Sequence, residues 1–550
     1  MLAAGKRMRQ AENIQCDTVI AGAGVAGLVT ALELLEHGQT VYLVDRDTSE
    51  RIGGLARWAF GGMALSGTRQ QRQMNIPDDS TLLLRDWYSF AEFAEDDLWP
   101  KAWAKEYAEH NNEKVYRWLT HLGLKFLPAV NWVERGLFVP GNSVPRYHVL
   151  WGTGRELVET IMVKLAPYIR QGKLDIFYRH KVVRPINDEG AVVGVEVENE
   201  QSKAVFSINA THVVIACGGI NGSSERVKQN WNVPWEEVPE TLLNGANPIS
   251  DGLLHDEVEA LGARVTHVDK MWNYAAGIAH PQAEFEGHGL SLIPCKSALW
   301  LDHLGKRIGP QPLVTGFDTH YLCQQVARQS KPWTWQVLNW TIAAKELAVS
   351  GAEHNPSIRD KKIFCFLKEI LFGNHRLVEE LAEQCEDFIC ADTLDDLTHK
   401  MNLLTKESYI DSADLAREIT LYDQRTVDTR LQNDEQLRRI HHARQWKPDR
   451  LRTRKPGPIL SAGTGKRDKL IAIRLKLISR KSLGGVQTNL SSQVLDRQGE
   501  PIVGLYCVGE AAGFGGGGAN GVRSLEGTFL SACILTARNA AAAIIGSKHR

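Results

Sequence analysis

The sequence predicts an α/β protein in which a Rossmann-like domain is interrupted by an inserted α+β domain. The first observation is a strand, a glycine-rich turn, a helix and a second strand within residues 16–47. The second is that strand-and-glycine segments recur at 211–222 and at 501–513. The third is that helical patterns of apolar residues fill 376–431. The chain is therefore expected to leave its first domain and return to it.

The overall composition favours a globular protein that acts on a small molecule. The chain has 550 residues, of which 43% are hydrophobic and 23% are charged. This is typical of globular proteins and long enough for about two to four domains. Lys and Arg (64) nearly balance Asp and Glu (65), so no net field attracts nucleic acid or an anionic membrane. We expect a small-molecule substrate and no nucleic-acid partner.

Cysteine usage and the apolar segments predict the compartment. Nine cysteines are scattered without a CxxC pair, which predicts reduced thiols, no metal or iron–sulfur site, and a cytoplasmic protein. Residues 1–15 lack the apolar core of a signal peptide, and the most apolar late stretch is interrupted by Arg538 and Asn539. We expect neither a signal peptide nor a membrane span.

The N-terminal unit carries a dinucleotide-binding fingerprint. The strand predicted at 18–21 runs into Gly22-x-Gly24-x-x-Gly27, a helix follows, and a second strand at 40–44 ends at Asp45. The glycines permit a tight turn and let a pyrophosphate approach the positive end of the helix. Asp45 can accept hydrogen bonds from the adenosine ribose.

Later segments extend this fingerprint. "RIGGLARWAFGGMALSG" (51–67) follows directly, "THVVIACGGING" (211–222) supplies another strand that ends in glycines, and "PIVGLYCVGEAAG" (501–513) has strand, glycine, acid and glycine. With these motifs the chain resembles the fumarate reductase/succinate dehydrogenase flavoproteins, and among them the FAD-binding dehydrogenases close to 3-ketosteroid Δ1-dehydrogenases.

The resemblance implies a glutathione-reductase type of fold and FAD as the cofactor. No His or Cys lies beside "RIGGLARW", so non-covalent FAD is expected. The residues that it implies for FAD are Gly22, Gly24, Ala26, Gly27, Asp45, Arg46, Gly53, Gly54, Ala216, Gly218, Gly509, Glu510, Ser524 and Leu525.

Two halves of one cofactor site so far apart in sequence predict an insertion. We expect a discontinuous FAD-binding domain at 1–269 and 451–550, with an inserted substrate or capping domain at 270–450. The stretch 444–470, rich in Pro, Gly and basic residues, is predicted to be the returning connection.

"GFGGGGANGVRSLEGT" (513–528) precedes the last predicted helix. We expect its glycines to let the backbone approach the flavin and substrate closely, and Ser524 to cap a helix that begins at once. Arg523 next to a helix N-terminus opposes the helix dipole. Either it binds a substrate carbonyl or carboxylate, as the comparable arginine of fumarate reductases does, or it pairs with Glu526.

Departures from both groups of relatives narrow the chemistry. Gly316 and Phe317 stand where fumarate reductases carry a catalytic arginine, and Lys481 stands where they carry a histidine, so fumarate reduction is not expected. The final glycine segment lacks the tyrosine of the ketosteroid dehydrogenases. The expected reaction is α,β-dehydrogenation of a carbonyl compound, for example a ketosteroid, or the reverse reduction.

The catalytic candidates for this reaction are Arg523, Tyr147, His148 and Tyr274. Hydride would pass between the β-carbon and flavin N5, a side-chain base would handle the α-proton, and an electron acceptor that no motif identifies would reoxidise the flavin. The alternatives are a reductase of an unsaturated acid, a flavin monooxygenase or amine oxidase, and a non-catalytic electron-transfer subunit.

Overall fold

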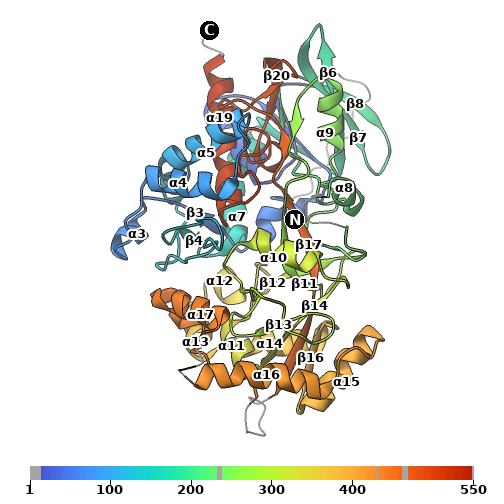
Figure 1. Ribbon diagram of the computed structural model, residues 1–550. Helices are drawn as coiled ribbons and strands as arrows, with labels where there is room; N and C mark the ends of the chain where they lie inside the picture. The colour runs from blue at the N-terminus through green and yellow to red at the C-terminus, as the bar shows by residue number, and fades with distance from the viewer. Residues whose placement is uncertain (1–13, 232–237, 429, 431–432, 461–468, 548–550) are drawn as a thin grey trace.

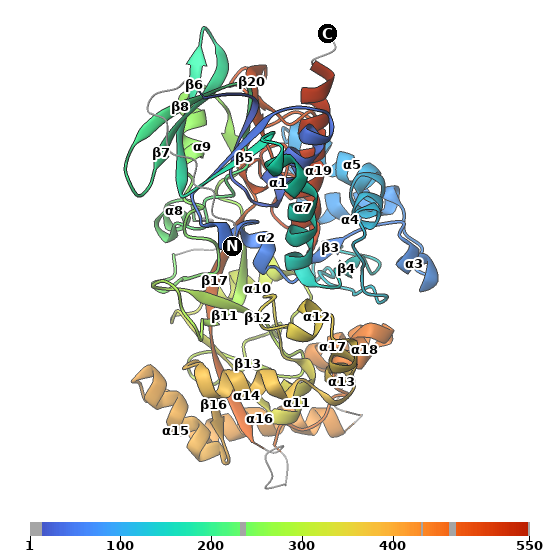
Figure 2. The same ribbon diagram turned by 180° about the vertical axis from the view of Figure 1, so that it is seen from behind.

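The computed structural model describes residues 14–231, 238–428, 430, 433–460 and 469–547. The N-terminal residues 1–13 and residues 461–468 of the predicted returning connection lie outside this part of the chain. Figures 1 and 2 show two lobes, each built on one sheet, with the strand β17 leading from one lobe into the other. The predicted α/β fold is confirmed.

The first lobe contains a sheet with a parallel centre. Its order is β19-β20-β7-β8-β1-β2-β5, with β6 paired to β7. The strands β1, β2, β5, β8 and β20 pair in parallel, whereas β6 and β7 form an antiparallel extension. The strands are β1 Ile14–Ala21, β2 Val41–Asp45, β5 Leu174–Tyr178, β6 His180–Asp188, β7 Ala191–Asn199, β8 Val205–Ile215, β19 Gln493–Leu495 and β20 Pro501–Cys507.

Helices cover this sheet, and the first of them follows the predicted glycine turn. A Cβ on Gly27 would collide with the carbonyl oxygen of Gly22, so glycine at 27 lets helix α1 pack closely on the strand before it. The helices of this lobe are α1 Val25–Glu36, α2 Leu55–Trp58, α3 Arg69–Gln73, α4 Ser80–Ala91, α5 Leu98–His110, α6 Trp118–His121, α7 Thr153–Arg170, α8 Ser224–Gln229, α9 Leu253–Ala260 and α19 Thr528–Ser547.

Helix α19 forms part of the core of the first lobe. It packs against α1, and among the described helices it is the one long and apolar enough to cross a membrane, with 67% of that apolar window buried inside the protein. The polar residues that interrupt it have protein partners: Arg538 pairs with Glu33 at 2.8 Å, and Asn539 donates to Glu106 at 3.0 Å. These contacts are typical of a core helix in a globular protein.

The second lobe contains a largely antiparallel sheet, ordered β13-β14-β17-β11-β12-β15, with β16 and β9 also paired to β17. Its strands are β9 Leu243–Asn244, β11 Met271–Ala279, β12 Gly289–Ile293, β13 Leu299–Leu301, β14 Thr334–Asn339, β15 Ala348–Val349, β16 Phe388–Ala391 and β17 Leu470–Ser482. Its helices are α10 Thr319–Ala327, α11 Trp340–Glu346, α12 Pro356–Arg359, α13 Ile363–Phe372, α14 His375–Gln384, α15 Leu394–Thr405, α16 Ser412–Val427, α17 Glu435–Gln445 and α18 Lys447–Arg452.

Two short pairings complete the described sheets: β3 Gly62–Ala64 with β4 Tyr147–Val149, and β10 Val265–Thr266 with β18 Gly485–Val486.

The predicted division at 270 and 450 stays a prediction. Strands β9 and β17 lie outside 270–450 and yet pair within the second sheet, so we propose wider limits for the insertion, at about 243 and 482. The C-terminal end of β17 returns to the first lobe, where the Ser482 amide donates to Glu510 at 2.9 Å. The returning strand itself therefore carries residues of the second lobe toward the predicted FAD site.

Candidate active site

A large cavity opens at the carboxyl ends of the parallel strands. It occupies about 1670 Å³ including its open mouth, and ligands of open α/β sheets bind at this edge. Of the residues predicted to hold FAD, those that line it are Gly22, Gly24, Ala26, Asp45, Arg46, Gly53, Gly54, Ala216, Gly218 and Glu510.

The cavity fits the pyrophosphate of a dinucleotide. Helix α1 begins next to it with Gly24 as N-cap, and neither a side-chain cap nor an acidic residue occupies its first turn. Its free N–H groups and positive end are therefore available to an anion. A Cβ on Gly24 would meet no protein atom within 4 Å, so a side chain there would take up space that the cavity leaves open.

Protein contacts fix the acidic and basic residues at the end of β2. The Asp45 carboxylate accepts hydrogen bonds from the amides of Ala23 and Asp47 at 2.5 and 2.8 Å, which holds it at the cavity wall. The Arg46 guanidinium pairs with Asp251 at 2.7 Å and with Glu200 at 2.9 Å. Asp45 can take the predicted ribose role, whereas the charge of Arg46 is already balanced by the protein.

Four predicted FAD residues do not line this cavity: Gly27, Gly509, Ser524 and Leu525. Gly27 and Gly509 serve backbone packing, since a Cβ on Gly509 would lie 2.9 Å from that of Ala26. The expectation that Ser524 caps the last helix is wrong: α19 begins at Thr528, and the Ser524 hydroxyl lies 2.7 Å from the Thr528 hydroxyl.

A second cavity lies next to the first and belongs mostly to the second lobe. Five residues line both cavities: Phe60, Tyr147, Tyr274, Ser350 and Glu526. We call this shared set the junction. It includes two of the predicted catalytic residues, Tyr147 and Tyr274, and one residue, Glu526, that the sequence analysis considered only as an ion-pair partner.

Glu526 is the hydrogen-bond acceptor of the junction. Its Oε2 accepts from the Tyr274 hydroxyl at 2.9 Å and from the Trp272 indole N–H at 2.8 Å. Burial, and then the negative charge of Glu526, raise the pKa of Tyr274 well above its ordinary value. Tyr274 is therefore a neutral phenol at physiological pH, and Glu526 is the carboxylate that it faces.

Two cations from the end of β17 line the first cavity beside the junction. Lys481 lies with its Nζ 4.3 Å from the centre of the Phe529 ring and 5.5 Å from that of Tyr274, and Arg480 donates to the Gly245 carbonyl at 2.7 Å. Burial lowers the pKa of Lys481 and raises that of Glu510, which lines the same cavity. Positive charge thus lies in the first cavity beside Tyr274 of the junction.

Tyr147 reaches the junction because two glycines leave room for its ring. A Cβ on Gly62 would collide with the Tyr147 ring, and one on Gly527 would lie 2.9 Å from its Cδ2. Strand pairing of β3 with β4 sets Tyr147 opposite Ala64. Burial raises the pKa of Tyr147, so its hydroxyl stays protonated.

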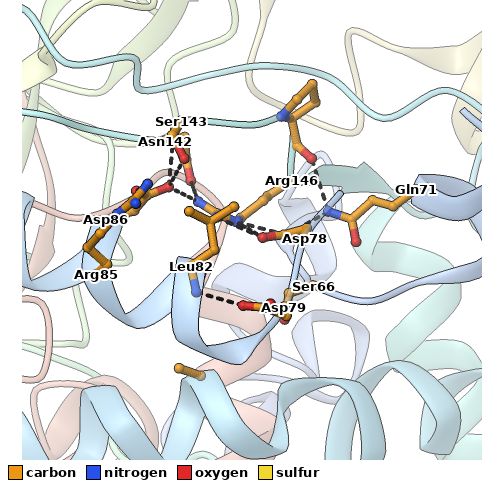
Figure 3. A network of polar contacts seen from close by, with 12 residues as sticks. Ser66, Gln71, Asp78, Asp79, Leu82, Arg85, Asp86, Asn142, Ser143 and Arg146 are labelled. Carbon is orange, nitrogen blue, oxygen red and sulfur yellow. Dashed lines mark hydrogen bonds and ion pairs between the residues drawn. The ribbon is translucent and has the colours of Figure 1, made fainter. Parts of the chain in front are cut away.

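Arg146, next in sequence to Tyr147, anchors this segment. Figure 3 shows its guanidinium between Asp78 and Asp86, at 2.8 and 2.6 Å, all three side chains being buried. Breaking such a buried pair is strongly destabilising. Arg146 thus fixes the strand that presents Tyr147.

His148 lines neither cavity. It is fully buried between the Thr68 hydroxyl at 2.8 Å and the Arg146 carbonyl at 2.6 Å, and burial lowers its pKa to about 4. The structure makes it a packing residue.

The glycine run also differs from expectation. A Cβ on Gly515 would strike the Trp103 ring, and one on Gly516 would strike the backbone of Trp99; both have positive φ, at 116° and 64°. These glycines permit close packing against the protein itself rather than against a ligand.

Arg523 is paired, but not with Glu526. Its Nη1 lies 2.6 Å from Glu92 and its Nε 3.1 Å from Asp318, and it lines neither cavity. Phe317 also lies outside both cavities; it stands at the position compared above with the arginine of fumarate reductases. The guanidinium carbons of Arg135 and Arg439 lie 5.5 and 5.9 Å from the centre of its ring.

Arg523→Ala is expected to affect stability more than turnover. The change removes the cation that pairs with the fully buried Asp318 carboxylate. Breaking a buried ion pair in this way lowers the free energy of unfolding by about 3 kcal/mol. Denaturant unfolding of the flavin-loaded protein measures the loss. A hundredfold drop in turnover at unchanged stability would instead support the substrate-binding role that its sequence position suggested.

Similarity to known proteins agrees with this geometry. A family model described as FAD binding domain matches residues 17–530. A KsdD-like steroid dehydrogenase of Mycolicibacterium smegmatis is 39% identical over 94% of this chain and 96% of its own length, and one of Mycobacterium tuberculosis is 36% identical over 96% of each.

Solved structures share the fold. A 3-ketosteroid Δ1-dehydrogenase from Sterolibacterium denitrificans, in complex with 1,4-androstadiene-3,17-dione, superposes with a TM-score of 0.68 at 16% identity, covering 98% of this chain and 100% of that one. A flavocytochrome c3 fumarate reductase gives 0.68 at 20% identity, over 97% and 78%. With its fingerprint, its cavity and these matches, the chain belongs to the FAD binding domain family, and FAD is its cofactor.

Proposed function

We propose that this protein removes hydrogen from the α and β carbons of a cyclic ketone of the ketosteroid class. The observation that carries the proposal is the junction: the FAD cavity and a second, largely apolar cavity meet at two tyrosines and a glutamate. Whole-length similarity to KsdD-like steroid dehydrogenases supports the substrate class.

The residues of the junction suit the proton chemistry of this reaction. The Tyr147 hydroxyl, which forms no hydrogen bond among the described residues, donates to the substrate carbonyl oxygen and stabilises negative charge that develops there. The α-proton passes to Glu526, directly or through the Tyr274 hydroxyl bonded to it. FAD, when bound in the first cavity, would supply the acceptor for the hydride that leaves the β-carbon. Phe60 and Phe529 help to keep the cavity wall apolar.

The residues at the predicted fumarate positions support dehydrogenation over fumarate reduction. Phe317 and Arg523 lie outside both cavities, and Lys481 replaces the histidine expected in fumarate reductases. All nine cysteines are free, which supports a cytoplasmic location.

Product analysis tests the proposal. Purified protein, 4-androstene-3,17-dione and an artificial electron acceptor are expected to give a product two hydrogens lighter by mass spectrometry. In parallel, fumarate with a reduced viologen dye should show no dye oxidation. Fumarate turnover with no steroid product would overturn the proposal.

A further inference from the structure

Two cationic side chains line the second cavity. Lys296, beside strand β13, and Arg452, at the end of helix α18, both line it. Within the described part of the chain, neither side chain forms an ion pair or hydrogen bond. Burial lowers the pKa of Lys296, and the charge of Arg452 is among the lesser causes that lower it further, so the two cations are close enough to repel each other.

The acids of the same cavity are already engaged. Asp449 pairs with Arg135 at 2.6 Å, and Glu346 accepts from the Ser297 hydroxyl at 2.6 Å. Burial raises the pKa of Glu134 to about 8, so its carboxyl is largely neutral at pH 7. The charge of Asp449 attracts both Lys296 and Arg452, but Asp449 forms its ion pair with Arg135, so the donor groups of both cations have no partner among the described residues.

Lys296 and Arg452 do not line the first cavity, although the charge of Arg452 is close enough to Tyr147 to act on the pKa of its hydroxyl. Tyr147, Tyr274 and Glu526 line both cavities, whereas Lys296 and Arg452 line the second alone. The wall of the second cavity as a whole is mainly apolar. This arrangement suits an apolar molecule that places a ketone at the junction and an anionic group against Lys296 and Arg452.

We propose that Lys296 and Arg452 form a subsite in the second cavity for a carboxylate carried by the substrate. The guanidinium fork and the ammonium match a carboxylate in geometry and charge. The preferred substrate is then a ketosteroid with an acidic side chain rather than a neutral one. This subsite deepens the proposed function and rests on it for the identity of the steroid.

Matched acids and esters test the subsite. Calorimetry on the flavin-loaded protein compares lithocholic acid with its methyl ester; both lack a ketone and so bind without turnover. Kinetics compares 3-oxochol-4-en-24-oic acid with its methyl ester. We expect the acid to be favoured about 10- to 100-fold in both assays, as for a charge-assisted hydrogen bond.

Charge-removing variants locate the effect. Lys296→Met and Arg452→Met should each lower the acid-to-ester ratio, and the double variant should bring it close to one. Arg450→Met, which removes the same charge two residues earlier on α18 and outside the cavity, should keep the wild-type ratio.

The outcomes separate the two proposals. A wild-type ratio near one, or a ratio that survives in the double variant, overturns the subsite. If the double variant loses its flavin, the acid-to-ester ratios of the wild type and of the two single variants test the subsite instead. Preferential binding of lithocholic acid that depends on both cations, with neither ketosteroid oxidised, supports the subsite and contradicts the proposed function.

Discussion

Glu526→Gln is expected to lower turnover about 10²- to 10⁴-fold, the loss typical when a general base is removed. Glutamine keeps the shape of the side chain and can still accept one hydrogen bond from Tyr274 or Trp272, but it cannot take up the α-proton. The FAD content should stay near that of the wild type, because the pyrophosphate cradle at Gly24 is unaffected. Stopped-flow measurement of flavin reduction by 4-androstene-3,17-dione gives the rate.

Two control variants test the specificity of this effect. Glu92→Gln removes a carboxylate that pairs with Arg523 outside both cavities, so the flavin should be reduced at close to the wild-type rate. Tyr274→Phe keeps Glu526 but removes the hydroxyl bonded to it, so its loss should be smaller than that of Glu526→Gln. Rapid flavin reduction in Glu526→Gln would remove Glu526 from the mechanism.

Gly24→Val is expected to give a colourless, folded protein with less than about a tenth of the wild-type flavin, because the backbone at this glycine must approach the pyrophosphate. The backbone at Gly24 has φ −67°, which valine adopts without strain, and its Cβ meets no protein atom within 4 Å. The fold should therefore tolerate the change while the new methyl groups fill the cradle. Absorbance of the flavin relative to protein measures the result.

Two other glycines, Gly27 and Gly546, provide the comparison. At Gly27 a Cβ would collide with the Gly22 carbonyl, so Gly27→Val should both unfold the protein and abolish flavin binding. At Gly546 a Cβ meets nothing within 4 Å and lies outside the cavity, so Gly546→Ala should keep both the fold and the flavin. Full flavin occupancy in Gly24→Val would contradict the placement of FAD.

The FAD half of the site was predictable because its signals are local. The spacing of Gly22, Gly24 and Gly27 after a strand, with Asp45 at the end of the next, dictates one turn and one helix start. Tyr147 and Tyr274 were predicted as chemically suitable catalytic residues, although no sequence pattern showed that they meet.

The rest depends on contacts between distant segments. Glu526 gains its role from Trp272 and Tyr274, more than 250 residues earlier, and its sequence position next to Arg523 suggested an ion pair instead. Arg523 is paired with Asp318, a residue of the second lobe that caps α10. The wider limits that we propose for the insertion likewise depend on β17, which joins the second sheet through pairings that no local pattern reveals.

Anaerobic addition of 4-androstene-3,17-dione to the oxidised, flavin-loaded protein tests the central claim most directly, namely that a ketone is oxidised where the two cavities meet. The predicted result is bleaching of the flavin absorbance without oxygen or added reductant, with about one steroid oxidised per flavin, and with bleaching strongly slowed in Tyr147→Phe and Glu526→Gln. A flavin that stays oxidised with 4-androstene-3,17-dione and with 3-oxochol-4-en-24-oic acid, or that bleaches equally fast in both variants, would contradict it.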